Sequence, residues 1–158
     1  GVKRVDVRSA LQMSEAVQQS APHAHVFIAA AAVADWRPAS AADQKIKKDG
    51  SGDTPELRFV ENPDILATIA KSPRAQSGDL FCVGFAAESH DLLAHATAKR
   101  ARKGVPLLVG NIGPSTFGQD DNALLLVDAQ GAKEFPRASK TQLAHDLIQD
   151  IAGRLRKI

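Results

Sequence analysis

The sequence predicts an α/β domain with a three-layer, Rossmann-like fold, a mostly parallel sheet and a C-terminal antiparallel hairpin. Short apolar runs alternate along the chain with longer segments of helical periodicity, which is the pattern of a parallel sheet with helices on both faces. Aromatic residues make up only 4% of the 158 residues, so aliphatic side chains must build the core. The length suits one domain over residues 1–158.

The first part of the chain predicts a strand, a helix, a second strand and a loop. Residues 2–7 have the pattern of a short strand, and a Ser-x-x-Gln capping box opens a helix over residues 9–19. The apolar run 25–32 is typical of a strand that is buried on both faces of a parallel sheet. The polar segment 35–52 is expected to be a long loop, and such loops are often functional lids.

The middle of the chain predicts a short strand over 57–60 and a helix that ends near residue 71. Asn62 is expected to be the N-cap of this helix and Pro63 its first residue. Residues 72–79 are expected to form a surface connection.

A second buried strand is expected over residues 80–86, followed by a helix that starts near Asp91. Gly104 is expected to end that helix in a left-handed conformation. The next strand is predicted over 105–109, and residues 111–122 are expected to be irregular.

The last part predicts a hairpin of strands 123–127 and 132–135, then a helix that a second capping box opens at Ser139. Ligands of open α/β sheets bind beyond the carboxyl ends of the strands. Function is therefore expected in three segments, residues 33–52, 85–90 and 111–122.

Composition excludes several classes of function. With 20 basic and 18 acidic residues, the net charge of +2 is too small to indicate a nucleic-acid-binding protein. No apolar run reaches the ~20 residues of a membrane span, and no secretion signal is visible, so the cytoplasm is the expected location. Cys82, the single cysteine, cannot form an internal disulfide and is expected to be inert packing. The histidines show no metal-site spacing.

Two segments at the predicted ligand-binding edge carry polar side chains. Small residues over 31–34 are followed by Asp35, whose carboxylate suits a ribose hydroxyl or a metal; the alternative is a simple turn. Lys45, Lys47 and Lys48 can close over a polyphosphate, or they can merely keep a surface loop solvated.

Three further patterns have a functional and a structural interpretation. A helix beginning at residues 63–65 offers free N–H groups to a ligand, or is an ordinary helix start. Phe85 can stack on a base or belong to the core. Lys99 and Lys103, four residues apart, can hold phosphates or stabilise the end of their helix. The loop 117–122 is either a binding loop or a turn.

Taken in order, these patterns form a specific set. Ala-Ala-Val-Ala-Asp-Trp-Arg-Pro, Lys-Ile-Lys-Lys, Glu-Asn-Pro-Asp-Ile-Leu, Val-Gly-Phe-Ala-Ala-Glu, Lys-x-x-x-Lys and Phe-x-x-Asp-x-Asn follow one another across nearly the whole chain. The set resembles the phosphopantothenoylcysteine synthetase domain of bacterial bifunctional coenzyme A enzymes.

This resemblance implies a ligase that joins 4′-phosphopantothenate to cysteine. In that family CTP activates the pantothenate carboxylate as an acyl-cytidylate and releases pyrophosphate, and the cysteine amine then displaces CMP. Mg²⁺ accompanies the triphosphate. The family's enzymes are homodimers, often fused to a flavin-dependent decarboxylase.

The resemblance also implies roles for single residues. Lys45 corresponds to the family's catalytic lysine, Asp35 to the residue at the nucleotide sugar, and Ala32 to backbone beside the cytosine. Pro63, Asp64, Ile65 and Leu66 correspond to the backbone that reads the base, Phe85 to an aromatic residue at the nucleotide, and Lys99 and Lys103 to the lysines at the triphosphate. No metal ligands are assigned.

The sequence departs from the family at two points. The family's Ser-Asn-x-Ser-Ser-Gly-x-Met-Gly phosphate loop lies upstream of Gly1, so the domain is expected to be N-terminally incomplete, and Ile112 stands where many relatives have Asp. Two other functions stay open. One is a Rossmann-like nucleotide-binding module without ligase activity, although no Gly-x-Gly-x-x-Gly and no P-loop motif is present. The other is a protein-interaction domain.

Overall fold

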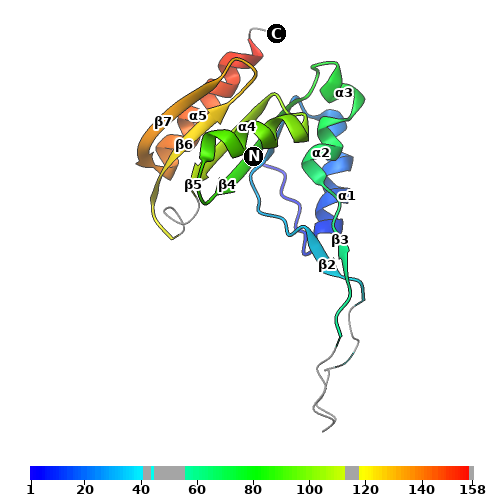
Figure 1. Ribbon diagram of the computed structural model, residues 1–158. Coiled ribbons are helices and arrows are strands. Elements are labelled where there is room, and N and C mark those ends of the chain that lie inside the picture. The colour runs from blue at the N-terminus through cyan, green and yellow to red at the C-terminus, as the bar shows by residue number, and fades with distance from the viewer. Residues whose placement is uncertain (41–43, 45–55, 113–117, 157–158) are drawn as a thin grey trace.

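The computed structural model describes residues 1–40, 44, 56–112 and 118–156 (Figure 1). The elements, in chain order, are α1 (Ala10–Ser20), the short 3-10 helix η1 (Ala21–His23), β1 (Val26–Ala29), β2 (Trp36–Pro38), β3 (Phe59–Glu61), α2 (Ile65–Ala70), α3 (Pro73–Gln76), β4 (Phe81–Glu88), α4 (Leu92–Lys103), β5 (Leu107–Ile112), β6 (Asp121–Val127), β7 (Ala132–Ser139) and α5 (Lys140–Leu155).

The main sheet has the strand order β1-β4-β5-β6-β7. Strand β4 pairs in parallel with β1 and β5, while β6 is antiparallel to β5 and β7 is antiparallel to β6. Four of the five strands therefore run in the same direction, and the predicted mostly parallel sheet with a C-terminal hairpin is confirmed.

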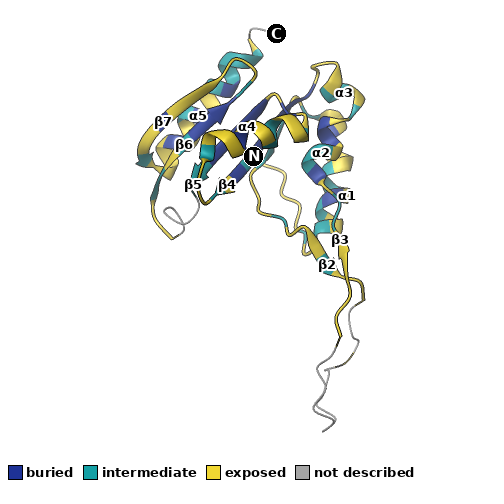
Figure 2. Cartoon of the chain, viewed as in Figure 1, coloured by how far each residue is buried: buried dark blue, intermediate teal, exposed yellow. Residues whose placement is uncertain are grey.

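Two hydrophobic clusters lie on the two faces of this sheet. Helices α2 and α4, with side chains of α1, cover one face, where Cys82 and Leu108 are buried. Helix α5 covers the other face through Leu143, Leu147 and Ile151. Figure 2 shows that the most deeply buried strands are the central ones. Helices on both faces of one sheet make the three layers that the sequence predicts.

The predicted strand over residues 2–7 is wrong, because this segment has no regular secondary structure and pairs with no strand among the described residues. A strand pattern needs a hydrogen-bonding neighbour, and Val2 and Val5 are exposed here. The apolar run 25–32 forms only the shorter strand β1. Among the described strands β1 pairs with β4 and no other, and it is half-buried rather than buried on both faces. A run of apolar residues shows that the segment is hydrophobic, but it does not determine how many strands and helices pack against it.

Part of the predicted loop 35–52 is a strand. Residues Trp36–Pro38 form β2, which pairs antiparallel with β3 and builds an arm that projects from the body (Figure 1). The strand expected over 57–60 is confirmed with a small shift, as β3 covers Phe59–Glu61. Its pairing partner lies more than twenty positions earlier in the sequence, which is why local patterns did not identify the arm.

The start of α2 differs from the sequence prediction. Asp64, not Asn62, is the N-cap, and its side chain accepts a hydrogen bond from the backbone N–H of Ala67. Asp and Asn are equally good N-caps, so local preference cannot choose between two positions this close. The predicted surface connection 72–79 contains a short helix, α3, capped by Ser72.

The remaining elements follow their patterns. Ser9 and Ser139 accept hydrogen bonds from the N–H groups of Gln12 and Gln142, as capping boxes predict. Gly104 ends α4 with a φ of 68°. Strands β4, β6 and β7 are longer than expected, and β5 continues into the segment 111–122 that was expected to be irregular. Pairing with neighbouring strands extends an element beyond its apolar residues.

Cys82 is buried in the middle of β4, as the sequence predicts. Burial raises the pKa of its thiol to about 11, so the thiol is protonated at neutral pH. Since the thiolate is the reactive form, Cys82 acts as a small apolar side chain of the core.

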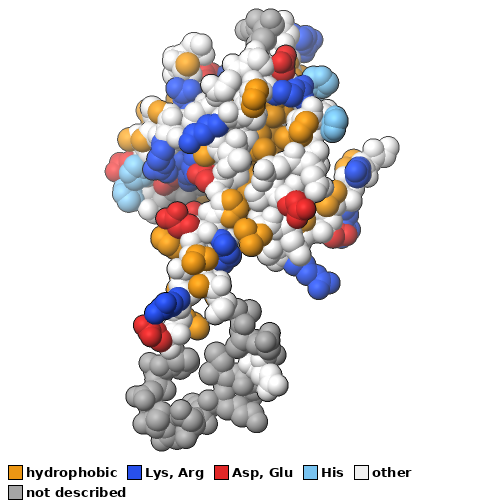
Figure 3. All heavy atoms as spheres, turned by 90° about the vertical axis from the view of Figure 1, so that its right-hand side faces the viewer, with side chains coloured by type: hydrophobic (Ala, Val, Ile, Leu, Met, Phe, Trp, Pro, Cys, Tyr) orange, Lys and Arg blue, Asp and Glu red, His pale blue; other side chains and the backbone are white. Residues whose placement is uncertain are grey.

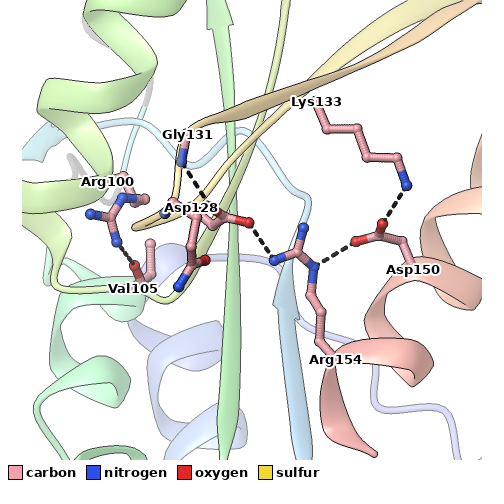
Figure 4. Close-up of polar contacts among 8 residues, drawn as sticks. Arg100, Val105, Asp128, Gly131, Lys133, Asp150 and Arg154 are labelled. Carbon is pink, nitrogen blue, oxygen red and sulfur yellow. Dashed lines mark hydrogen bonds and ion pairs between the residues drawn. The ribbon is translucent and has the colours of Figure 1, made fainter. Parts of the chain in front are cut away.

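A network of ion pairs fastens α5 to the turn between β6 and β7 (Figure 4). Arg154 donates to Asp128 at 2.6 Å and to Asp150 at 2.5 Å, and Asp150 also accepts from Lys133 at 2.8 Å. Burial raises the pKa of Asp128 and Asp150. Hydrogen bonds from Arg154 and from the turn N–H groups outweigh it for Asp128, and those from Lys133 and Arg154 outweigh it for Asp150, so both pKa values lie below their ordinary range. Both carboxylates therefore stabilise the fold at neutral pH.

We expect Arg154→Met to lower the free energy of unfolding by about 2 kcal/mol, because two half-buried carboxylates lose their shared partner. Urea unfolding followed by circular dichroism measures this change. Lys133→Met removes the exposed end of the same network, and as a control it should cost less than about 1 kcal/mol.

The pH dependence separates the electrostatic loss from a packing defect. The folded-state pKa values of Asp128 and Asp150 lie below the ordinary value of 3.8. Their stabilisation is present above that value and is lost as the pH falls through the folded-state values. The difference between wild type and Arg154→Met should therefore fade in acid, whereas a difference that stays constant would point to packing.

Candidate functional site

The segment that follows β1 is held against the segment that precedes α2 by Asn62. Its side-chain amide donates to the carbonyl of Ala34 at 2.8 Å, and its backbone N–H donates to the carbonyl of Asp35 at 2.8 Å. Arg37 donates to the Asn62 side chain at 3.2 Å and to the carbonyl of Glu61. Asn62 therefore fixes the base of the arm beside the start of α2.

Asp64 links the start of α2 to the last turn of α4. One carboxylate oxygen caps α2 through the N–H of Ala67 at 3.0 Å, and the other pairs with Lys103. Burial raises the pKa of Asp64, but the hydrogen bonds from Lys103 and Ala67 outweigh it and hold the pKa below its ordinary value. Asp64 is therefore charged at neutral pH and neutralises Lys103.

Glu88, the last residue of β4, makes a second set of ion pairs with α4. Its Oε1 lies 3.6 Å from Lys99 Nζ, and its Oε2 lies 3.7 Å from His95 Nδ1. His95, Lys99 and Lys103 are spaced by four residues and therefore lie on one face of α4. The structure thus presents two lysines on this face, one helical turn apart, each beside a carboxylate.

Two glycines let the helices approach the sheet closely enough for these contacts. A Cβ atom at Gly84 would lie 2.6 Å from Leu66 Cδ2 and 2.8 Å from Leu108 Cδ1. A Cβ atom at Gly110 would lie 2.8 Å from Leu92 Cδ1. The missing side chains therefore set the positions of α2 and α4 over β4 and β5.

We expect Gly84→Ala to destabilise the fold by about 1–3 kcal/mol, because the buried Leu108 and the partly buried Leu66 must move to admit the methyl group. Thermal unfolding measures this change. Gly153→Ala on α5 is the control, since its Cβ would have no atom within 4 Å and alanine favours the helix. A Gly84→Ala chain as stable as wild type would show that Leu66 and Leu108 repack without cost.

The predicted site residues fall into one group and two exceptions. The contacts of Asn62, Asp64 and Glu88 link the segment after β1, the start of α2 and helix α4. The group lies on or beside these three segments and consists of Ala32, Asp35, Pro63, Asp64, Ile65, Leu66, Lys99 and Lys103. Phe85 is an exception, because it packs into the cluster under α5 while its neighbour Gly84 faces α2. Lys45 lies outside the described residues.

Three residues of this arrangement were not singled out by sequence reasoning. Asn62 was interpreted only as a cap, and neither Glu88 nor His95 was given a role. His95 has a sequence signal, because it stands four residues before Lys99 on the same helix face. The contacts of Asn62 and Glu88 join distant segments, so no local pattern could identify them.

The arm carries exposed apolar side chains. Trp36 and Phe59 are each 56% exposed, and Leu57 and Val60 are also exposed. Figure 3 shows hydrophobic side chains along the arm, between charged groups. An apolar patch on a projecting ribbon is typical of a contact surface.

In the part of the chain that the structure describes, hollows lie elsewhere on the surface, and neither of the following two is lined by a predicted site residue. The one of about 680 Å³ is lined by Arg100 and the Asp128–Arg154 network, and the one of about 440 Å³ lies between β7 and α5. Within the described ranges, no three His, Cys, Asp or Glu side chains are grouped to hold a metal ion. The helices described here are too short or too polar to cross a membrane.

A family model for the C-terminal domain of DNA/pantothenate metabolism flavoproteins matches residues 1–155. The chain belongs to this family. Two curated relatives are named coenzyme A biosynthesis bifunctional protein CoaBC. The Vibrio cholerae protein is 42% identical over 147 residues, which is 91% of this chain and 36% of the relative. The Escherichia coli protein is 40% identical over 157 residues, 97% of this chain and 38% of the relative. The chain therefore spans less than two-fifths of their length.

Solved structures share the fold. The crystal structure of the C-terminal domain of CoaBC matches with a TM-score of 0.76 and 26% identity, covering 98% of this chain and 66% of that chain. A mutant of Cab2 in complex with phosphopantothenate-cysteine matches with a TM-score of 0.70 and 20% identity, over 94% of this chain and 51% of that chain. The α/β fold with its mostly parallel sheet is thus that of the flavoprotein C-terminal domain family.

Proposed function

We propose that this chain binds CTP and belongs to a ligase that joins 4′-phosphopantothenate to cysteine through an acyl-cytidylate, in coenzyme A biosynthesis. Membership of the pantothenate-metabolism family supports this proposal, as do relatives named for coenzyme A biosynthesis. The single observation in the site that carries it is the pair Lys99 and Lys103, one turn apart on α4, with Lys99 beside the end of β4 and Lys103 beside the start of α2.

The proposed nucleotide occupies the group of linked segments around Asn62. Backbone groups over residues 63–66 and beside Ala32 read the cytosine, and Asp35 contacts the ribose. Lys99 and Lys103 contact the triphosphate. In the free chain, their carboxylate partners take the place of its phosphates. Phe85 is proposed as a further nucleotide contact, although it lies on the α5 face of β4 and apart from this group.

The reaction needs positive charge at the triphosphate. A carboxylate that attacks the α-phosphate meets like charge, and further charge develops on the departing pyrophosphate. Lys45 is proposed as the catalytic cation, and Lys99 and Lys103 as further cations at the triphosphate. Mg²⁺, carried by the triphosphate, would neutralise part of its charge.

Two features of the whole protein are also proposals. The name "bifunctional" and the greater length of the relatives support fusion to a second enzyme domain, proposed to be a flavin-dependent decarboxylase. The exposed apolar side chains of the arm support a homodimer. Sedimentation equilibrium tests the dimer.

Thermal unfolding with CTP, ATP and NAD tests the nucleotide. A ligand that binds only the folded chain stabilises it by about 2.7 kcal/mol when present at 100 times its Kd. We expect CTP to raise the melting temperature more than ATP. Stabilisation by NAD and not by CTP would contradict the ligase proposal and favour a dehydrogenase-like module. An unchanged melting temperature with all three nucleotides would favour an interaction domain.

A further inference from the structure

The carboxylate of Glu88 lies beside two side chains of α4. Lys99 Nζ and His95 Nδ1 each approach a different oxygen, at 3.6 and 3.7 Å. The Glu88 side chain is 21% exposed, against 30% for Lys99 and 44% for His95. If Lys99 turned away toward an anion, a largely buried carboxylate would lose its lysine, which is costly without another cation.

His95 is placed to supply that cation. It stands one helical turn before Lys99, as Lys99 stands one turn before Lys103. Histidine side chains can gain a proton in the physiological pH range, and a nearby carboxylate favours the charged form. The row His95, Lys99 and Lys103 therefore has two carboxylates, Glu88 and Asp64, for up to three positive charges.

Of the other charged groups near this row, Arg102 of α4 acts on Asp64, while groups on the neighbouring elements have contacts of their own. The His90 ring stands edge-on to His95 with centroids 5.0 Å apart, and it contacts Ser89 at 2.8 Å and Asp91 at 4.0 Å. On β5, the residue opposite Glu88 is the apolar Ile112. On β6, Asp121 is paired with Arg137 at 2.6 Å. Among the described residues, Glu88 is thus the carboxylate paired with His95.

We propose that Glu88 and His95 are positioning residues of the triphosphate site, and that His95 takes up a proton and pairs with Glu88 when Lys99 turns to the phosphates. This proposal rests on the proposed CTP site. In the free chain Glu88 holds Lys99 over the end of β4. In the bound chain the same carboxylate pairs with the imidazolium, so that a negatively charged ligand is accompanied by one proton.

Isothermal titration calorimetry in buffers of different ionisation enthalpy measures the protons taken up on binding. At about neutral pH, where histidines titrate, CTP binding to wild type should take up a clear fraction of a proton more than binding to His95→Gln. Both chains bind the same CTP, so the titration of its own phosphates cancels in the comparison. His90→Gln, which removes the neighbouring imidazole, should behave as wild type.

The affinities give a second readout. Near pH 6 we expect His95→Gln to bind CTP about tenfold more weakly than wild type, and this difference should shrink as the pH is raised to 8, because the proposed uptake of a proton becomes less favourable. Glu88→Gln should also lose the extra proton uptake, because His95 then has no carboxylate to pair with. A merely structural role of either residue would change stability without changing the proton count.

The outcomes separate this proposal from the CTP proposal. Equal proton uptake by wild type and His95→Gln, with CTP bound by both, overturns the role of His95 and leaves the CTP site standing. Inorganic pyrophosphate is the second probe. Proton-coupled binding of pyrophosphate without binding of CTP would support the cation row and refute the nucleotide, whereas no binding of either probe overturns both proposals.

Discussion

Lys103→Met is expected to weaken CTP binding about 30-fold, because a charge-assisted hydrogen bond contributes about 2 kcal/mol and each 1.4 kcal/mol is about tenfold in Kd. The loss has a second cause in this structure. Asp64 pairs with Lys103, so removal of the lysine leaves a carboxylate beside the proposed phosphates. Isothermal titration calorimetry with CTP gives the Kd of each chain.

Arg102→Met is the matched control for this prediction. Arg102 precedes Lys103 on α4, is exposed, and lies on another side of the helix. Its removal changes the net charge by the same amount, so a general loss of positive charge would weaken both chains equally. Equal effects of the two substitutions would remove Lys103 from the phosphate site.

Lys45→Ala is expected to slow acyl-cytidylate formation at least about 100-fold, which is the size of effect expected when one charge-stabilising donor is lost in the transition state. The basis is the proposed role of Lys45 as the cation at the reacting phosphate. The measurement is pyrophosphate release in a single turnover of the full-length gene product, with CTP and 4′-phosphopantothenate but without cysteine.

The matched control is Lys71→Ala, an exposed lysine at the end of α2. It should leave the rate of pyrophosphate release and the melting temperature unchanged. Lys45→Ala should keep the wild-type circular dichroism spectrum, because the sequence around it contains no large apolar run. Wild-type rates for Lys45→Ala would discard the catalytic assignment.

Sequence patterns predicted correctly those elements that depend only on residues close together in the sequence. The caps at Ser9 and Ser139, the left-handed Gly104 and the hairpin of β6 and β7 each depend on residues a few positions apart. The failures are long-range. Strand β2 needs β3 as a partner, and residues 2–7 pair with no strand among the described residues.

The candidate site divides in the same way. The spacing of Lys99 and Lys103 predicted a shared helix face, and the structure confirms it. Their partners Glu88 and Asp64 belong to other elements, so these pairs could not be predicted from spacing. Neighbouring residues of a strand point to opposite faces of the sheet. Gly84 and Phe85 therefore face opposite sides, although they belong to one sequence motif.

The connectivity of the sheet also has a consequence for the order of folding. Strands β6 and β7 and helix α5 follow one another directly, and α5 packs back on the hairpin, so this unit closes only short loops. The pairing of β1 with β4 instead joins Val26 to Phe81 across the arm and two helices. Closing a long loop loses more chain entropy than closing a short one, so the hairpin and α5 are expected to assemble first. Strand β5 is then expected to pair with the edge of this unit, and the other parallel strands follow.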